Sequence, residues 1–148
     1  MKERVVRYLL LACCLAGAVL SAVSLHSHYS ASATEYCDLS TTFNCDLVNR
    51  SVYSELFGVP VALVGLLGYL LLFGLSLRDR SPMIALRLVA AIVGFGFALY
   101  LAYVEAYVLA VWCLLCIGSL TMISAITVLS GVALWRGGEG KGEIHAGR

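Results

Sequence analysis

Four long apolar segments dominate the chain, and the stretches between them contain most of its charged residues. The segments run from Val5 to Leu25, from Val59 to Leu77, from Met83 to Tyr107 and from Ala110 to Leu134. An α-helix needs about 20 apolar residues to cross a hydrocarbon core of about 30 Å, and each segment is close to that length. The pattern therefore predicts an all-α membrane protein whose four transmembrane helices form a bundle.

Two of these segments have a second interpretation. The first begins with basic residues and ends near small ones, as a cleaved secretory signal does, but its apolar run exceeds the usual length of about 7 to 15 residues, so we expect a retained span. The third and fourth segments are nearly continuous, and Glu105 and Tyr107 mark the expected break. We expect Glu105 to be a solvated turn residue rather than a proton donor.

The longest polar connection, residues 26–58, lies between the first and second spans. Within it, Asp46 to Phe57 has apolar residues at near-helical spacing, which predicts a short amphipathic helix that caps the bundle at the membrane surface. Gly58 and Pro60 suit the end of that helix and the start of the second span. His26 and His28, after the first span, are expected to be interface residues without a structural partner.

The composition agrees with a membrane domain and excludes an ordinary soluble one. Of the 148 residues, 61% are hydrophobic and only 13% are charged, and the mean hydropathy is +0.91. Soluble domains contain about 25% charged residues. The net charge of +1, without a basic stripe, predicts no nucleic-acid partner. We expect one transmembrane domain over residues 1–136 and a disordered, glycine-rich cytoplasmic tail over 137–148.

The basic residues predict the orientation in the membrane, because Lys and Arg near helix ends are retained on the cytoplasmic side. Apart from Arg50, all of them flank the same side of the predicted bundle: Lys2, Arg4, Arg7, Arg78, Arg80, Arg87, Arg136, Lys141 and Arg148. Both termini are therefore predicted to be cytoplasmic. The loop 26–58 then faces the periplasm of a bacterial inner membrane, or the ER lumen if the source is eukaryotic, and both compartments are oxidising.

Four of the six cysteines should lie at that exoplasmic end. Cys37 and Cys45 lie in the loop, and the turn-forming residues between them allow the Cα separation of about 5.5 Å that a disulfide needs. Cys113 and Cys116 form a C-x-x-C at the outer end of the fourth span, where the helix dipole favours a reactive thiolate. Two dithiols that face each other can pass on an electron pair by thiol–disulfide exchange.

Other interpretations of the cysteines are weaker. The seven residues between Cys37 and Cys45 break the spacing of structural zinc ligands, so we expect no metal. A disulfide within the C-x-x-C would constrain the unfolded chain by only about 2 kcal/mol, which makes a structural staple a poor explanation. If that pair were merely buried apolar cysteines, the matching loop pair would be a coincidence. Cys13 and Cys14, inside the first span, are expected to be small packing residues.

The order of these motifs resembles the vitamin K epoxide reductase family. The resemblance rests on Cys37-x7-Cys45, on Ser51 six residues later, on the Phe57-Gly58-Val59-Pro60 entry into a span, and on Trp112-Cys113-Leu-Leu-Cys116. It covers the chain from Tyr36 to Leu134. The chain is thereby identified as a bacterial-type member without a fused thioredoxin domain.

The resemblance implies a four-helix bundle around a quinone, which would be ubiquinone, menaquinone or vitamin K. It implies that Cys37 exchanges with a thioredoxin-like exoplasmic partner, that Cys45 passes the electrons to Cys113, and that Cys116 lies against the quinone ring. Further contacts to the quinone are expected from Ser51, Phe57, Trp112 and Tyr103. For Trp112 and Tyr103, anchoring at the lipid interface is the competing interpretation. We expect a monomer in the lipid membrane.

The predicted function is a membrane thiol oxidase that reduces a quinone and supports disulfide bond formation. One alternative is a vitamin K epoxide or quinone reductase of the ER. Vertebrate members of the family have an asparagine and a tyrosine where this chain has Ser54 and Leu120, which favours quinone over epoxide. An alternative of another class is a noncatalytic membrane scaffold that the loop cysteines staple.

Overall fold

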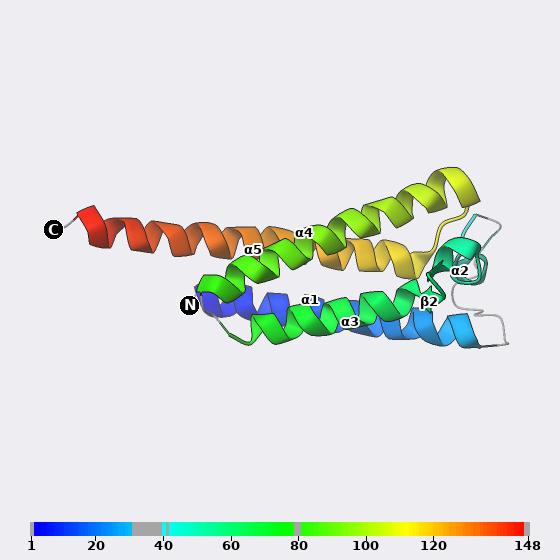
Figure 1. Ribbon diagram of the computed structural model, residues 1–148, viewed down its shortest axis with the longest axis horizontal. Helices are drawn as coiled ribbons and strands as arrows, with labels where there is room; N and C mark the ends of the chain where they lie inside the picture. Colours follow the sequence, from blue (N-terminus) through cyan, green and yellow to red (C-terminus); the bar gives the residue numbers. More distant parts are fainter. Residues whose placement is uncertain (1, 31–39, 41, 79–80, 147–148) are drawn as a thin grey trace.

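Four long helices form an up-and-down bundle in the computed structural model, which describes residues 2–30, 40, 42–78 and 81–146 (Figure 1). They are α1 (Lys2–Tyr29), α3 (Val61–Ser76), α4 (Ser81–Tyr103) and α5 (Leu114–Ala146). Both termini lie at one end of the bundle, with the end of α3 and the start of α4. The short elements gather at the opposite end, called the cap end below. The predicted four-helix membrane bundle is confirmed.

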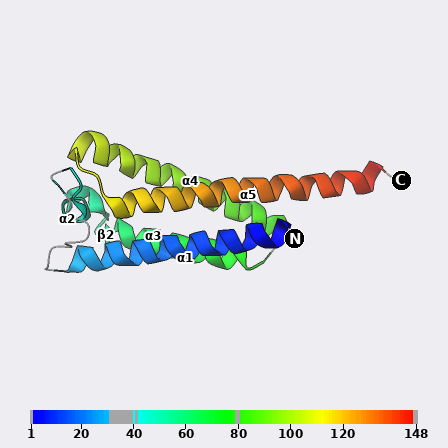
Figure 2. The ribbon, with the colours of Figure 1, turned by 180° about the vertical axis from the view of Figure 1, so that it is seen from behind.

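The helices pack in a closed ring. α1 contacts α3 and α5, and α4 contacts the same two helices from the other side. Figures 1 and 2 both show α3 beside α1 and α4 beside α5. Such neighbours follow from short connections between antiparallel helices.

Three segments are long and apolar enough to cross a membrane, namely Glu3–Tyr29, Pro82–Leu109 and Leu114–Arg136. The fourth helix, α3, is apolar but has only 16 residues and is therefore about 24 Å long. It is shorter than the predicted span from Val59 to Leu77 because Val59 and Pro60 belong to a strand. α5 continues to Ala146, into the expected tail, whose disorder in solution stays a prediction.

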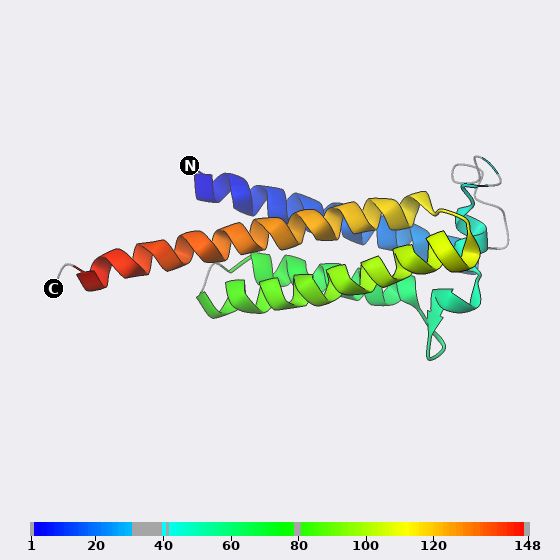
Figure 3. The same cartoon turned by 90° about the horizontal axis from the view of Figure 1, so that it is seen from above.

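The cap end differs from the single amphipathic helix predicted for Asp46 to Phe57. Four short elements replace it: α2 (Cys45–Asn49), the 3-10 turn η1 (Val52–Ser54), β1 (Glu55–Leu56) and β2 (Val59–Pro60). The helix prediction was wrong over most of this segment, because the near-helical spacing of apolar residues also fits a helical turn followed by a hairpin. Figure 3 shows this hairpin, in green, projecting beside the bundle.

The turn of that hairpin explains why glycine occupies position 58. β1 and β2 pair antiparallel, with Leu56 opposite Val59, so only Phe57 and Gly58 form the connection. Both have positive φ, 53° at Phe57 and 80° at Gly58. Two-residue hairpin turns of this kind need left-handed backbone at both positions, which glycine adopts without steric cost. Gly58 therefore closes a hairpin rather than capping a helix.

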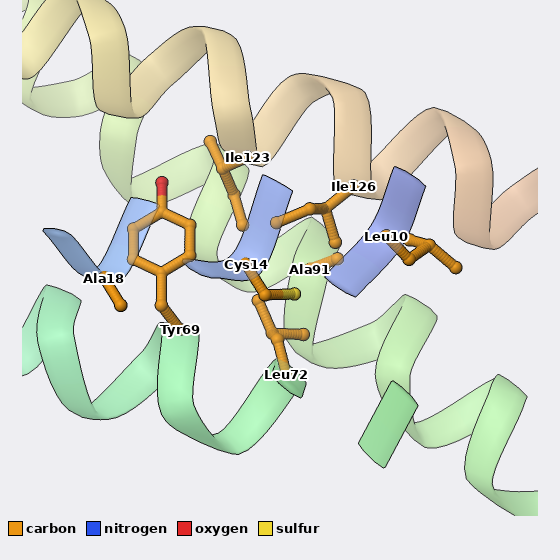
Figure 4. Packing of buried hydrophobic residues seen from close by; sticks show 8 residues of the cluster. All are labelled: Leu10, Cys14, Ala18, Tyr69, Leu72, Ala91, Ile123 and Ile126. Atoms are coloured by element: carbon orange, nitrogen blue, oxygen red, sulfur yellow. The ribbon is translucent and has the colours of Figure 1, made fainter. Parts of the chain in front are cut away.

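One hydrophobic core joins all four helices in the half of the bundle away from the cap end. Its buried members are Leu10, Cys14, Ala18, Tyr69, Leu72, Ala91, Ile123 and Ile126 (Figure 4). Tyr69 spans the bundle, because its hydroxyl bonds to the carbonyl oxygen of Ser119 at 2.8 Å. A Cβ at Gly17 would overlap the Tyr69 ring, so α1 and α3 approach closely only because of that glycine. The prediction that Cys13 and Cys14 are packing residues is confirmed.

Candidate active site

The first part of the site is the loop cysteine Cys45, which is the first residue of α2 and fully buried. Asn44 caps this helix, because its Oδ1 accepts a hydrogen bond of 2.7 Å from the amide of Leu47. Side-chain oxygens at this position satisfy amides that a helix leaves unpaired at its start. The cap therefore fixes where α2 begins and, with it, the position of the Cys45 sulfur.

A short bridge between backbones joins this loop to the segment before the C-x-x-C. Phe43 and Trp112 form a parallel bridge, in which the amide of Trp112 donates to the carbonyl of Thr42 at 2.8 Å. The amide of Asn44 donates in turn to the carbonyl of Trp112 at 3.1 Å. Because Cys45 and Cys113 each follow the bridge directly, the two hydrogen bonds bring their side chains together.

The two sulfurs are in contact. The Sγ atoms of Cys45 and Cys113 lie 3.3 Å apart, and both residues are fully buried. Cys45 is disulfide-bonded, whereas Cys113 and Cys116 are free thiols. Cys37, the expected partner of Cys45, lies outside the described residues, so its pairing and its role stay predictions. An exchange between the loop and the C-x-x-C would begin from this contact.

The sequence predicts Cys113 in the first turn of the fourth span. In the structure Cys113 instead caps α5. Its carbonyl accepts a hydrogen bond of 3.0 Å from the amide of Ile117, and α5 begins at Leu114. A hydrogen bond from the Cys116 thiol lowers the pKa of Cys113; burial opposes this, and the backbone amides of Cys116 and Leu115 reinforce it. Cys113 therefore ionises more readily than an ordinary thiol, and the thiolate is the nucleophile in disulfide exchange.

Glu105 is part of this site, and the prediction of a solvated turn residue is wrong. The residue lies in η2 (Val104–Leu109), a π-helical continuation of α4, and is only 2% exposed. Its Oε2 accepts a hydrogen bond of 3.0 Å from the amide of Cys113. The π-helix turns the carboxyl inward, and Ala110, with a left-handed φ of 51°, then reverses the chain toward Cys113.

A cavity of about 600 Å³ opens inside the bundle next to these residues. Its walls are mostly aliphatic and aromatic, and Cys116 and Glu105 belong to them. Of the residues expected to contact a quinone, Ser51 and Trp112 line this cavity. Phe57 is 98% exposed at the hairpin turn, and the Tyr103 ring lies tilted against that of Tyr107 with ring centroids 5.0 Å apart; neither Phe57 nor Tyr103 is among the lining residues.

The sequence analysis missed a polar network on the other wall of the cavity. Asn49 of α2 accepts a hydrogen bond of 2.8 Å from Ser24, and its carbonyl oxygen lies 2.6 Å from Nδ1 of His28. Nε2 of His28 lies 3.4 Å from Glu55, so the prediction that His28 has no structural partner is wrong. The small polar residues Ser24 and Ser27 on α1 were the available signal, because they face inward within an apolar span.

The cavity suits a quinone head group in size and in chemistry. Ligand pockets usually measure about 300 to 1,000 Å³ and combine apolar walls with a few polar groups. Two residues that line this cavity, Asn49 and Glu105, each have a buried side-chain atom without a hydrogen-bond partner among the described residues, namely Nδ2 of Asn49 and Oε1 of Glu105. A ring with carbonyl or hydroxyl groups would satisfy such atoms, which are costly to leave unpaired.

The sequence also matches a known family. The model of the vitamin K epoxide reductase family matches residues 8–131, which include most of α1, the cap end, α3, α4 and more than half of α5. The members of this family are membrane oxidoreductases that couple thiol–disulfide exchange to a quinone. The described bundle has the expected architecture, with two cysteines in contact and a third, Cys116, in the wall of an apolar cavity. The chain belongs to the vitamin K epoxide reductase family.

Proposed function

We propose that this protein is a thiol oxidase that supports disulfide bond formation on the exoplasmic side of its membrane. Electron pairs would pass from a thioredoxin-like partner through Cys37 and Cys45 to Cys113 and Cys116, and then to a quinone. The observation that carries the proposal is the distance of 3.3 Å between the sulfurs of Cys45 and Cys113. No other pair of cysteines on separate described segments has such a contact.

The exchange within the protein takes two steps. When the loop is reduced and the C-x-x-C oxidised, the Cys45 thiolate attacks Sγ of Cys113, which forms a Cys45–Cys113 disulfide and releases the Cys116 thiolate. The Cys37 thiolate then attacks Cys45, which closes the loop disulfide and releases Cys113. One electron pair has then moved from the loop cysteines to the C-x-x-C. In the structure Cys45 is in a disulfide and Cys113 and Cys116 are free thiols, which is the state that these two exchange steps produce.

The roles of the other residues follow from their positions. Cys116 lines the cavity and would face the quinone, which accepts two electrons and two protons when it is bound. Cys113 is buried between Cys45 and Cys116 and connects the loop with the cavity. Apolar walls exclude water from the thiols, which keeps them from reacting with anything but their neighbours. Ser51 and Trp112 would limit the position of the ring.

The proposed location is a bacterial inner membrane with the cap end facing the periplasm. Lys2, Arg4, Arg7 and Arg78 all belong to the end of the bundle that carries both termini (Figure 1). The positive-inside rule would hold this end in the cytoplasm. The cysteines of the cap end would then meet an oxidising compartment and its soluble thiol proteins.

Reduction of a quinone is favoured over reduction of an epoxide. Leu120 lines the cavity with an aliphatic side chain, which offers no hydrogen-bond donor to an epoxide oxygen. The Ser54 hydroxyl, also at the cavity, donates to the carbonyl of Ser51 at 2.7 Å. A noncatalytic scaffold does not explain why the chain belongs to a family of quinone-dependent oxidoreductases.

Turnover in vesicles tests the proposed path. The full chain is reconstituted with a quinone and a reduced thioredoxin-like protein, and quinol formation is followed by absorbance. We expect Cys37→Ser, Cys45→Ser, Cys113→Ser and Cys116→Ser each to abolish quinol formation. Cys13→Ser, in the packed half of α1, is the matched control and should retain it.

Trapping identifies the order of transfer. In the double variant Cys37→Ser/Cys116→Ser, only Cys45 and Cys113 remain at the cap end, and mild oxidation should join them in one disulfide. If this crosslink does not form while the Cys13→Ser control remains active, the proposed path from loop to C-x-x-C is wrong. Full activity of Cys37→Ser with the protein donor would likewise exclude entry through the loop.

A further inference from the structure

Among the described residues, a single carboxyl group lies in the apolar interior of the cap end. Glu105 is 2% exposed and lines the cavity, and the described lining residues include no Lys or Arg. A buried carboxylate without a cation is expensive, because low-dielectric surroundings disfavour the charge. Such a group is found where it exchanges a proton or receives hydrogen bonds as compensation.

The two carboxyl oxygens of Glu105 have different surroundings. Oε2 accepts the hydrogen bond from the Cys113 amide, which holds the side chain in place. Oε1 is buried and has no partner of hydrogen-bonding geometry among the described residues. The Cys116 thiol nevertheless lies near enough to the carboxyl for each group to affect the charge of the other. One oxygen is therefore fixed by the backbone, and the other is available beside the sulfur that faces the cavity.

The reaction at this point requires proton movement as well as electron transfer. Oxidation of the Cys113–Cys116 dithiol breaks two S–H bonds and forms one S–S bond. The electron pair and two protons convert a quinone into its quinol, so atoms and charge balance without any other reactant. Both protons must cross a cavity whose walls are mostly apolar. A carboxyl group next to Cys116 is placed to carry a proton over this gap.

We propose that Glu105 is a catalytic proton carrier, which takes the proton from the Cys116 thiol as its sulfur is oxidised and delivers it to the quinone side of the cavity. This inference rests on the proposed function, because it assumes that Cys113 and Cys116 form the dithiol that the quinone oxidises. It adds Glu105 to the proposed path, between the sulfur of Cys116 and the quinone. Proton transfer by a positioned side chain contributes about 10² to 10⁴ in rate.

Few other titratable groups of the described chain face this position. Cys113 and Cys116 face it from the start of α5, and Cys45 lies behind Cys113 on α2. His28, Tyr53 and Tyr69 line the same cavity from α1, η1 and α3. His28 is held by Asn49 and Glu55, and the Tyr69 hydroxyl is held by Ser119. Glu105 is the one of these groups that combines a hydrogen bond to the backbone of the C-x-x-C with a buried, unpartnered oxygen.

The substitution Glu105→Gln separates proton transfer from positioning. Glutamine has nearly the same shape, and its carbonyl oxygen can still accept the hydrogen bond from the Cys113 amide, but it cannot exchange a proton. Removal of the carboxylate also removes a negative charge that opposes thiolate formation at Cys113. Loss of the charge alone would therefore make the thiols more reactive. A slower reaction in this variant can only come from the lost proton transfer or from a disturbed structure.

Two measurements on the full chain in vesicles test the inference. The rate of quinol formation, from a reduced dithiol donor, is measured across pH for wild type, Glu105→Gln and Glu105→Asp. We expect Glu105→Gln to be about 100-fold slower and to lose the rise in rate that accompanies ionisation of the carboxyl. Glu105→Asp should recover part of the rate. Glu3→Gln, which removes an exposed carboxyl from the first turn of α1 at the other end of the bundle, is the control and should behave as wild type.

The second measurement needs no quinone. Alkylation of Cys113, quantified by mass spectrometry, should become faster at neutral pH in Glu105→Gln, and the Cys45–Cys113 crosslink should form as in the parent Cys37→Ser/Cys116→Ser protein. A rate within about twofold of wild type, with an unchanged pH profile, overturns the inference. So does a slow variant that has also lost the crosslink, because Glu105 then only holds the structure. If instead Cys116→Ser keeps turning over, the proposed function itself fails.

Discussion

Among the described residues, each half of the bundle buries one charged side chain near cysteines, and only one of these arrangements is suited to chemistry. In the half away from the cap end, Arg87 of α4 is 1% exposed and lies near Cys14 of α1. At the cap end, Glu105 lies against Cys113 and Cys116. The residue types alone, a charge and two thiols within apolar helices, do not distinguish the two places.

The surroundings of the two buried charges distinguish the two places. Nε of Arg87 donates a hydrogen bond of 3.1 Å to Ser130, Cys14 interacts with Ser76, and the core packs around them. Cys13 and Cys14 are consecutive on one helix and therefore point in different directions. At the cap end, a third sulfur lies 3.3 Å from Cys113, and the cavity-lining residues Glu105 and Asn49 each have a buried, unpartnered side-chain atom. Satisfied polar groups stabilise a fold, and unsatisfied ones beside a cavity prepare it for a ligand.

The largest expected effect comes from removing one cysteine in each half of the bundle. Cys116→Ala should lower quinone reduction by roughly 1,000-fold or more, because it removes one of the two reacting sulfurs. Cys14→Ala should leave the rate within about twofold and reduce the stability by about 1 kcal/mol, since it only shortens a packed side chain. Quinol formation and thermal unfolding in detergent measure the two results. If Cys14→Ala were as inactive as Cys116→Ala, the two halves would not differ in the proposed way.

A second comparison uses two alanines of α4. Ala91 is fully buried in the core, whereas Ala102 lines the cavity. Ala91→Leu should destabilise the protein by about 1 to 3 kcal/mol, because the packed core has no room for three more carbons. Ala102→Leu should change stability little and raise KM for the quinone, because the new side chain occupies ligand space. Thermal unfolding and steady-state kinetics check both, and an unchanged KM in Ala102→Leu would exclude this part of the cavity as the quinone site.

Much of the fold could be predicted because hydrophobic length reports membrane spans directly. The four spans, the common side of both termini and the packing role of Cys13 and Cys14 follow from apolar runs that the bilayer requires. The cap end was predicted less well. Over so few residues, periodicity cannot distinguish a helix from a turn and a hairpin, and the φ values at Phe57 and Gly58 depend on strand pairing.

The cysteine motif in the sequence pointed to the site, but not to its other parts. Nothing in the spacing indicates that Trp112 pairs with Phe43, although this bridge aligns the two sulfurs. Glu105 was assigned to a solvated turn because it lies at the end of a span. An ionisable residue at membrane depth is a functional candidate by default, and that physical rule was the better guide here.

A third prediction concerns pH and the hydrogen bond between the cysteines of the C-x-x-C. In wild type the pKa of Cys113 lies below its ordinary value of 9.0, chiefly because the Cys116 thiol donates to its sulfur. Cys116→Ala removes that donor and should raise the pKa of Cys113. At neutral pH the thiolate fraction, and with it the alkylation rate, should fall about tenfold for each unit of the change. Alkylation of Cys113 across pH, followed by mass spectrometry, measures this.

The lowered pKa of Cys113 also makes the stability of the fold depend on pH. Since the pKa is lowered on folding, the thiolate of Cys113 stabilises the fold fully above its ordinary value of 9.0, and this contribution is lost as the pH falls through the lowered pKa. Cys14→Ala, in the packed half, is the control and should leave the titration of Cys113 unchanged. An unaltered alkylation profile in Cys116→Ala would show that the backbone amides at the start of α5 are sufficient to stabilise the thiolate.

The smallest expected effect comes from the cap of α2, which positions the Cys45 sulfur next to Cys113. Asn44→Ala removes the cap of α2 and should cost about 1 kcal/mol locally, because the Leu47 amide loses its partner. In the Cys37→Ser/Cys116→Ser background we expect the Cys45–Cys113 disulfide to form about fivefold more slowly. With Asn44→Ala as the only change, a small dithiol that reduces the C-x-x-C directly should still support the normal rate of quinol formation. Thr121→Ala, which removes an exposed hydroxyl from α5, is the matched control. Should both steps slow equally, Asn44 would support the whole cap end rather than the contact between the two sulfurs.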